Sequence, residues 1–172
     1  MTAPVLHTAR LTLGPLGALH VAPFAAFYAS DRSHHVGGPK SAEDAWRQLA
    51  CEIGHWTLRG YGPFAITETA TGRALGIVGP WFPEGWPEPE LMWSLFAGAE
   101  GQGFATEAAL AARDWAYATL GWTTAISLVA ADNPGSAAVA RRLGCVPDGD
   151  FTHARFGTVG VWRHPAPQPE RV

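Results

Sequence analysis

Charged residues are scarce in this sequence, and that shortage excludes one large class of protein. Only 16% of the 172 residues are charged, and the formal net charge is −3. Lys40 is the single lysine. Nonspecific nucleic-acid binding needs a basic face that neutralises phosphates. The composition therefore predicts no nucleic-acid partner.

Cysteine and long apolar runs are also rare. The two cysteines, Cys51 and Cys145, are too few for a disulfide framework. No stretch reaches the roughly 18 continuous apolar residues that a membrane-spanning helix requires. The opening residues, MTAPVLHTARLTLGPL, lack the basic region and apolar segment of a secretory signal. We therefore expect a cytoplasmic protein with reduced cysteines and no membrane partner.

Hydrophobic residues make up 47% of the chain, which is typical of a globular protein. The length suits one domain, which we place at residues 1–164, followed by a flexible tail, PAPQPERV, at 165–172. Apolar periodicity and turn residues predict the elements in order. They are a strand at 9–14, a short or kinked helix at 15–29, a loop at 31–40, a helix from Ser41 to Gly60, a hairpin of 63–69 and 73–80, a proline-rich loop at 81–90, a strand at 90–96, a helix at 104–120, a strand at 123–130, a helix at 133–143 and a closing hairpin to 164.

This order predicts a mixed α/β (α+β) fold. Antiparallel strands come first, and the helix at 104–120 then joins two strands that can lie parallel. The loop before this helix, GAEGQG, has two glycines one residue apart. Such a loop lets backbone amides approach an anion closely. It contains no lysine or arginine, and the next basic residue is Arg113.

Two common phosphate loops fit this sequence poorly. A nucleotide-hydrolase loop ends in Gly-Lys-Ser/Thr, whereas this one reads GQGFAT. A dinucleotide fingerprint needs a third glycine where Thr106 stands. The dinucleotide fingerprint also needs an acidic residue at the end of the next strand, and here the loop falls mid-chain after antiparallel strands.

Residues 89–144 resemble the GNAT superfamily of acetyl-CoA-dependent N-acetyltransferases, and most of all its RimJ/RimL-like group. The resemblance lies in PELMWSLFAGAEGQGFATEAALAARDWAY and in ADNPGSAAVARRLG. It implies a central, mostly antiparallel, twisted sheet of six to seven strands flanked by about four helices. It also implies that strands 90–96 and 123–130 splay apart, with a bulge in the first, and that pantetheine lies in the gap.

The resemblance implies a cofactor site for acetyl-CoA, and the physical chemistry of the loop agrees with it. Amides at the positive end of a helix dipole can hold the pyrophosphate without a cationic side chain. Asn133 and Ser136 match the N-x-x-S of the family, but asparagine and serine also cap helices in proteins generally. The expected cofactor-binding residues are Leu95, Phe96, Gly101, Gln102, Gly103, Phe104, Ala105, Thr106, Asn133 and Ser136.

Two residues are candidates for catalysis. Glu90 matches a family glutamate and is the candidate general base; the alternative is an exposed carboxylate at the start of a strand. Ser136 is the candidate general acid for the leaving thiolate. Many family members have a tyrosine seven residues after the asparagine, where this sequence has Ala140. The acid is therefore Ser136 or water.

The acceptor side is defined less sharply by the sequence. His34, His35, Trp81 and Trp93 are candidate substrate-binding residues, from the loops that line the acceptor pocket in this family. The same histidines with Cys51 and His55 could suggest a metal site, but they lack two tight ligand pairs, and we expect no metal.

We therefore expect acetyl transfer from acetyl-CoA to a primary amine. A noncatalytic or regulatory acyl-CoA-binding domain and transfer of a longer acyl group are the alternatives. The sequence does not distinguish among four classes of amine acceptor: a protein N-terminus, an amino acid, a polyamine and a drug-like amine. A homodimer stays open as well.

Overall fold

The computed structural model describes residues 3–167, so residues 168–172 of the predicted tail lie outside it. The chain forms β1 (Leu6–His7), β2 (Leu11–Gly14), the 3-10 helix η1 (Ala18–His20), α1 (Val21–Tyr28), the 3-10 helix η2 (Asp31–Val36), α2 (Ala42–Arg59), β3 (Phe64–Glu68), β4 (Ala74–Trp81), β5 (Glu90–Leu95), α3 (Phe104–Leu120), β6 (Ile126–Val129), α4 (Pro134–Arg142), β7 (Val146–His153) and β8 (Gly157–Arg163).

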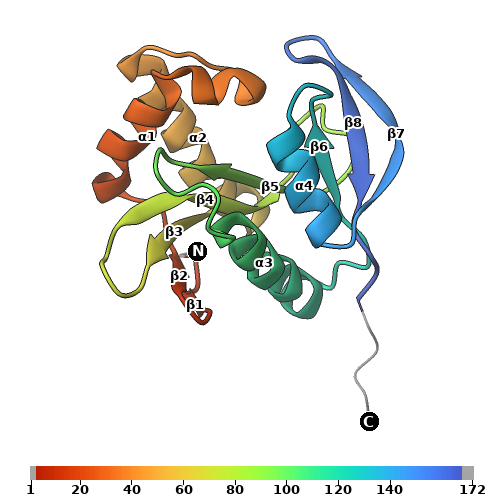
Figure 1. The fold of residues 1–172 in the computed structure, drawn as a ribbon, viewed down its shortest axis with the longest axis horizontal. Coiled ribbons are helices and arrows are strands. Elements are labelled where there is room, and N and C mark those ends of the chain that lie inside the picture. Colours follow the sequence, from red (N-terminus) through yellow and green to blue (C-terminus); the bar gives the residue numbers. More distant parts are fainter. Residues whose placement is uncertain (1–2, 168–172) are drawn as a thin grey trace.

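The strands form one open sheet in the order β1-β2-β3-β4-β5-β6-β8-β7 (Figure 1). Every neighbouring pair is antiparallel except β5 and β6, which are parallel. The predicted mixed, mostly antiparallel sheet is therefore confirmed, but it has eight strands, not six or seven. The additional edge strand β1 has two residues, too few to produce a periodic pattern.

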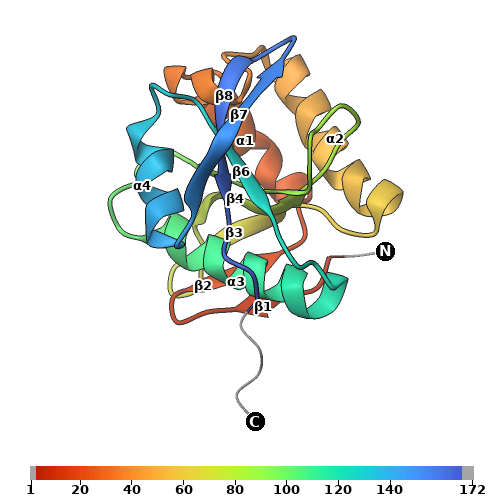
Figure 2. The same ribbon diagram turned by 90° about the vertical axis from the view of Figure 1, so that its right-hand side faces the viewer.

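Helices cover both faces of the sheet (Figure 2). Alternate residues of a strand point to opposite faces. On β3 and β4, Ala65 and Ile77 join the core cluster that also contains residues of α1 and α2. Phe64 and Val78 join the cluster on the α3 side. The two cores hold the middle of the sheet rigidly between the helices, and this middle carries β5.

The β5 and β6 strands separate soon after they meet. Their parallel pairing consists of Glu90 opposite Ile126, and the predicted splay is confirmed. The bulge expected in β5 is wrong, because all six of its pairs with β4, from Trp81–Glu90 to Gly76–Leu95, keep one register. The splay therefore begins on the β6 side of β5 while the β4 side stays regular.

Three local predictions differ from the structure. Pro23 does not break α1, because it lies in the first helical turn, where a missing N–H costs no helix bond. The predicted loop at 31–40 contains η2. Trp81, expected in the proline-rich loop, is the last residue of β4.

Candidate functional site

The first turn of α3 is open to a ligand. Its N-cap is Gly103, at φ +81°, and a glycine has no side chain with which to cap the helix. By contrast, the long helix α2 is capped by the side chain of Ser41, which accepts a hydrogen bond from the N–H of Asp44. Because the early N–H groups of a helix have no partner within the helix, α3 presents free donors and the positive end of its dipole.

The glycine loop is braced from outside by Arg10, which follows β1. Its Nη1 donates to the carbonyl of Gln102 at 2.9 Å, and its guanidinium forms an ion pair with Glu107 of α3 at 2.7 Å. The guanidinium also lies 4.5 Å from the centroid of the Phe104 ring. Arg10 therefore fixes the loop against the helix start. The sequence did not predict this contact, because Arg10 lies more than ninety residues before Gln102 and Glu107 in the chain.

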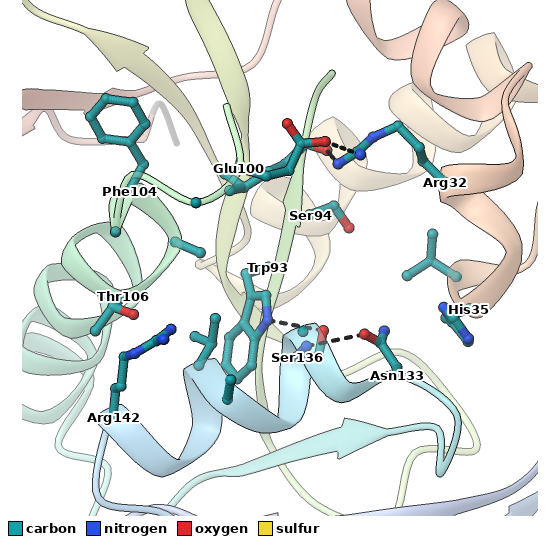
Figure 3. A pocket seen from close by; sticks show the side chains of 18 of the residues that line it. Arg32, His35, Trp93, Ser94, Glu100, Phe104, Thr106, Asn133, Ser136 and Arg142 are labelled. Carbon is teal, nitrogen blue, oxygen red and sulfur yellow. Dashed lines mark hydrogen bonds and ion pairs between the residues drawn. The ribbon is translucent and has the colours of Figure 1, made fainter. Parts of the chain in front are cut away.

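A cavity of about 670 Å³ lies against this helix start (Figure 3). It is lined by most of the predicted cofactor residues, namely Leu95, Gly101, Gly103, Phe104, Ala105, Thr106, Asn133 and Ser136. The structure does not bring Gln102 or Phe96 to its wall. The Gln102 side chain donates to the carbonyl of Gly98 at 3.1 Å. The Phe96 ring is buried against Phe24 and Phe27.

Thr106 and two arginines give the cavity polar groups for an anion. The Thr106 hydroxyl is buried and has no hydrogen-bond partner among residues 3–167. Figure 3 shows Arg142 of α4 on the same side of the pocket and Arg32 of η2 on the other. Arg32 forms an ion pair with Glu100. Both arginines were missed from the sequence, since neither lies near the glycine loop along the chain.

Asn133 and Ser136 lie at the start of α4 and make different polar contacts. Asn133 Oδ1 accepts from the N–H of Ser136 at 3.0 Å, so Asn133 is the helix cap. The Ser136 hydroxyl is not a cap; it accepts from the indole N–H of Trp93 at 3.3 Å (Figure 3). This leaves the serine proton free to be donated. Trp93, expected on the acceptor side, lines the 670 Å³ cavity.

The peptide groups of β5 alternate between its two neighbours. The N–H of Phe96 donates to Leu75 beside β4, at 2.8 Å. In an antiparallel pair the intervening residues face the other way, so Trp93 and Leu95 direct their peptide groups toward the gap beside β6. Arg32 Nη2 donates to the carbonyl of Leu95 there, at 3.0 Å. The gap thus offers backbone donors and acceptors where the ladder has ended.

Side chains close the narrow end of the gap. Ser127 Oγ donates to the carbonyl of Leu91 at 2.6 Å, and His164 Nε2 lies 2.9 Å from the same hydroxyl. Burial, with a smaller contribution from the charge of the nearby Arg113, lowers the pKa of His164 to about 3. The imidazole is therefore neutral at physiological pH and acts as a fixed hydrogen-bond partner.

Glu90 is buried, so the exposed carboxylate considered as its alternative does not occur. Its Oε1 accepts from the N–H of Leu128 at 3.0 Å, and its Oε2 accepts from the indole N–H of Trp86 at 2.6 Å. Burial raises its pKa to about 7, against the lowering effect of these two hydrogen bonds. A carboxyl group with this pKa can take up a proton near neutral pH.

A second cavity, of about 450 Å³, lies on the other side of Glu90. Trp81 and Trp86 line it, together with aromatic residues of the β7–β8 hairpin that sequence analysis did not select. His35 lines both large cavities and pairs with Asp132 at 3.0 Å. The neighbouring His34 is exposed and lines neither large cavity.

A small space of about 60 Å³ lies in the gap between β5 and β6 and shares lining residues with both large cavities. It shares Trp93 and Ser136 with the larger cavity and shares Glu90 with the second one. Ala140 lines none of these spaces; it is fully buried in the core with Leu143. The position of the family tyrosine therefore faces the core in this chain.

The arrangement of side chains and helices also bears on two other kinds of site. Among residues 3–167, no group of three or more His, Cys, Asp or Glu side chains is arranged to hold a metal ion. Both nitrogens of His55 are already within hydrogen-bond distance of backbone groups, the carbonyl of Tyr61 and the N–H of Phe82. In the same part of the chain, no helix is both long enough and apolar enough to cross a membrane.

The sequence and the fold were compared with known proteins. The acetyltransferase (GNAT) domain profile matches residues 10–146. An acetyltransferase from Agrobacterium tumefaciens strain C58 is 38% identical, with 95% of each chain covered and a TM-score of 0.87. No curated protein matches the sequence significantly.

Two further solved structures share the fold at lower identity. One is a putative ribosomal-protein-serine acetyltransferase from Vibrio cholerae, 20% identical over 97% of this chain and 100% of that chain, with a TM-score of 0.78. The other is RimL, a ribosomal L7/L12 alpha-N-protein acetyltransferase, 18% identical over 95% of this chain and 94% of that chain, with a TM-score of 0.74. The domain match and the Agrobacterium relative cover most of the chain. The chain therefore belongs to the GNAT family of acyl-CoA-dependent N-acetyltransferases.

Proposed function

We propose that this protein transfers the acetyl group of acetyl-CoA to the nitrogen of a primary amine by direct attack on the thioester. The observation that carries the proposal is the start of α3, which has no side-chain cap, beside the Thr106 hydroxyl, which has no hydrogen-bond partner among residues 3–167. Both lie at the wall of the 670 Å³ cavity. A buried hydroxyl without a partner is costly unless a ligand satisfies it. A pyrophosphate supplies oxygen acceptors for that hydroxyl and for the free amides.

The rest of the cofactor site follows from the same geometry. Arg142 can add a charge-assisted contact to a phosphate. The peptide groups of Trp93 and Leu95 can pair with the amides of the pantetheine arm in the gap beside β5. The thioester, an activated acyl donor, would then lie close to Glu90 and Ser136, where the two large cavities meet.

The chain's own groups account for the proton transfers. An amine is mostly protonated at neutral pH and must lose a proton before its nitrogen can attack. Glu90 takes that proton as its carboxylate. As the new carbon–nitrogen bond forms and the carbon–sulfur bond breaks, the nitrogen releases its second proton to water. The thiolate accepts a proton from water, or from Ser136, which then regains its proton from water.

The acceptor enters from the 450 Å³ cavity in this proposal. The ribosomal substrates named for the structural neighbours belong to those proteins. The RimJ/RimL-like resemblance keeps a protein N-terminus among the candidates, beside small-molecule amines. The two unpaired cysteines, Cys51 and Cys145, agree with the proposed cytoplasmic location.

A panel of peptides and small amines, incubated with acetyl-CoA and a reagent for free thiols, tests the proposal. Thiol release that depends on an amine supports acetyl transfer. Binding of acetyl-CoA without thiol release for any amine would favour the noncatalytic alternative, for which the core position of Ala140 is the supporting observation. Faster release from a longer acyl-CoA would show that the acyl group, and not the reaction, was misassigned.

A further inference from the structure

Glu52 of α2 is a buried carboxyl group without a complete set of partners. Glu52 is only 1% exposed, and its Oε1 accepts a hydrogen bond from Gln48 Nε2 at 3.2 Å. Its other oxygen, Oε2, is buried with no hydrogen-bond partner in the part of the chain that the structure describes. Glu52 lines the 450 Å³ cavity together with Glu90. Glu84 also lines this cavity, but it is exposed and forms an ion pair with Arg59. Glu52 is therefore a buried carboxyl group of the cavity, besides Glu90, that the acetyl-transfer mechanism does not use.

No protein cation neutralises this carboxyl directly. Lys40 Nζ lies 3.4 Å from Gln48 Oε1, to which it donates, and 5.2 Å from the centroid of the Tyr28 ring. Among residues 3–167, Glu52 takes part in no ion pair. Burial raises the pKa of Glu52 to about 8, and the hydrogen bond from Gln48 and the charge of Lys40 only reduce the shift. An unpaired buried carboxyl is a costly feature for a stable core.

The walls of the same cavity are largely aromatic. Trp86 lies 5.8 Å from Phe156, centroid to centroid, and Phe156 stacks on His153 at 4.7 Å. Trp81 also lines this cavity and stacks on His55. These rings provide contact area for a flat or apolar body of small size. Together with the two carboxyl groups, they define a ligand with an apolar middle and hydrogen-bond donors.

Resting on the proposed function, we infer that Glu52 recognises a second hydrogen-bond donor on the acceptor. The acceptor is then a small amine with an aromatic or aliphatic body and a further ammonium or hydroxyl group, which pairs with Glu52 Oε2 while the reacting nitrogen lies by Glu90. The cationic residues of this cavity are at more open positions: Lys40 is half-buried and Arg155 is exposed. An anionic arm held by these two residues is the competing possibility.

Two isosteric pairs of amines test the inference. The first pair is 4-(aminomethyl)benzylamine and 4-ethylbenzylamine, and the second is 1,6-diaminohexane and heptylamine. In each pair an ammonium replaces a terminal methyl group. Binding to the full chain is measured by calorimetry at pH 7 with saturating CoA, and acetylation is measured separately by thiol release. The anionic arm is represented by 4-(aminomethyl)phenylacetic acid.

The variants are Glu52→Met and, as control, Glu43→Met on the exposed part of the same helix. Methionine approximates the length and volume of the side chain, and removing a buried carboxyl group whose Oε2 has no hydrogen-bond partner within residues 3–167 is not expected to destabilise the fold. In at least one of the two pairs, we expect the wild type and the control variant to bind the diamine at least about tenfold more tightly than the isosteric monoamine. This factor is the scale of one charge-assisted hydrogen bond. Glu52→Met should abolish this ratio and leave binding of the monoamine within about twofold.

A ratio near one in the wild type, a ratio unchanged in Glu52→Met, or preferred binding of the phenylacetic acid would overturn the inference. Loss of the ratio with equal weakening of the monoamine would also overturn it, because it would show a structural role. Acetylation of an amine with no dependence on Glu52 defeats the inference and keeps the proposed function. A Glu52-dependent binding ratio without thiol release would support the role of Glu52 in amine binding and contradict the proposed acetyl transfer.

Discussion

The indole N–H of Trp86 donates a 2.6 Å hydrogen bond to Oε2 of Glu90. Trp86 belongs to the proline-rich segment between β4 and β5, so this contact connects an irregular loop to the first residue of the central splayed strand. Together with the N–H of Leu128, it holds both carboxylate oxygens in place. The carboxyl group that we propose as the base is thus held in place at the wall of the 450 Å³ cavity by the protein alone.

Replacing Glu90 by glutamine keeps the shape of the side chain and removes its basicity. Because burial raises the pKa of Glu90 to about 7, its carboxylate form increases as pH rises through that value. We expect wild-type kcat/KM to rise through about pH 7, and Glu90→Gln to lack this rise and to be about 10²-fold slower at pH 7. The difference should shrink at high pH, where the amine loses its proton unaided.

Rate–pH profiles of the two proteins with one amine provide the check. Acetyl-CoA affinity should be equal in both. A loss of the same size at every pH would assign Glu90 to positioning and remove it as the base.

The leaving thiolate is the subject of a second prediction. We expect Ser136→Ala to lower kcat by about 10²-fold if the hydroxyl returns the proton. Thermal stability should stay unchanged, because Asn133 and not Ser136 caps α4. Ser41→Ala is a contrasting control: it removes the cap of α2, which should cost about 1 kcal/mol of stability without changing kcat. Full activity of Ser136→Ala would leave water as the acid.

Much of this architecture was readable from the sequence, and particular residues show why. The helix at 104–120 was predicted with its observed ends, since Gly103 and Gly121 flank a continuous alanine-rich stretch. The glycine loop could be proposed as a phosphate site because that proposal depends on the local spacing of Gly101 and Gly103, which the sequence shows directly. Arg10, Arg32 and Arg142 were missed because each reaches the site through the tertiary fold.

Glu52 was missed although the sequence carries a signal for it. Ala45, Leu49 and Trp56 form the buried face of α2, and Glu52 falls on the same helical stripe. A charged residue on such a stripe indicates either a buried pair or a site. Trp46 and Ile53 are apolar and recur at helical spacing with these residues, but in the structure they are exposed.

The glycine loop offers a matched pair of variants. Gly103 has φ +81° at the start of α3, and Gly121 has φ +67° at its end. Valine at either position strains the backbone by about 1–2 kcal/mol or more. We expect both variants to lose stability, but only Gly103→Val to lose the rise in melting temperature that acetyl-CoA gives the wild type. A normal rise in Gly103→Val would make the loop purely structural.

The unpartnered hydroxyl of Thr106 leads to a fourth prediction. Thr106→Val keeps the shape and removes a hydroxyl that has no partner within residues 3–167. Without ligand, the variant should be as stable as the wild type or more stable. Its Kd for acetyl-CoA should increase about tenfold or more, the scale of a hydrogen bond to a charged group.

Calorimetric titration with acetyl-CoA measures this change. Thr152→Val, on the exposed β7–β8 hairpin, controls for the loss of a hydroxyl elsewhere. An unchanged Kd in Thr106→Val would place the phosphates away from this wall of the cavity.

The most direct test of acetyl transfer is the stoichiometry of products from a single reaction. Wild-type protein is incubated with excess acetyl-CoA and an amine that binds to it, and free CoA thiol and N-acetylated amine are quantified together. We predict one thiol for each acetylated amine over many turnovers, and no thiol above background when the amine is omitted. Bound acetyl-CoA that yields neither product with any amine of the panel would contradict the account.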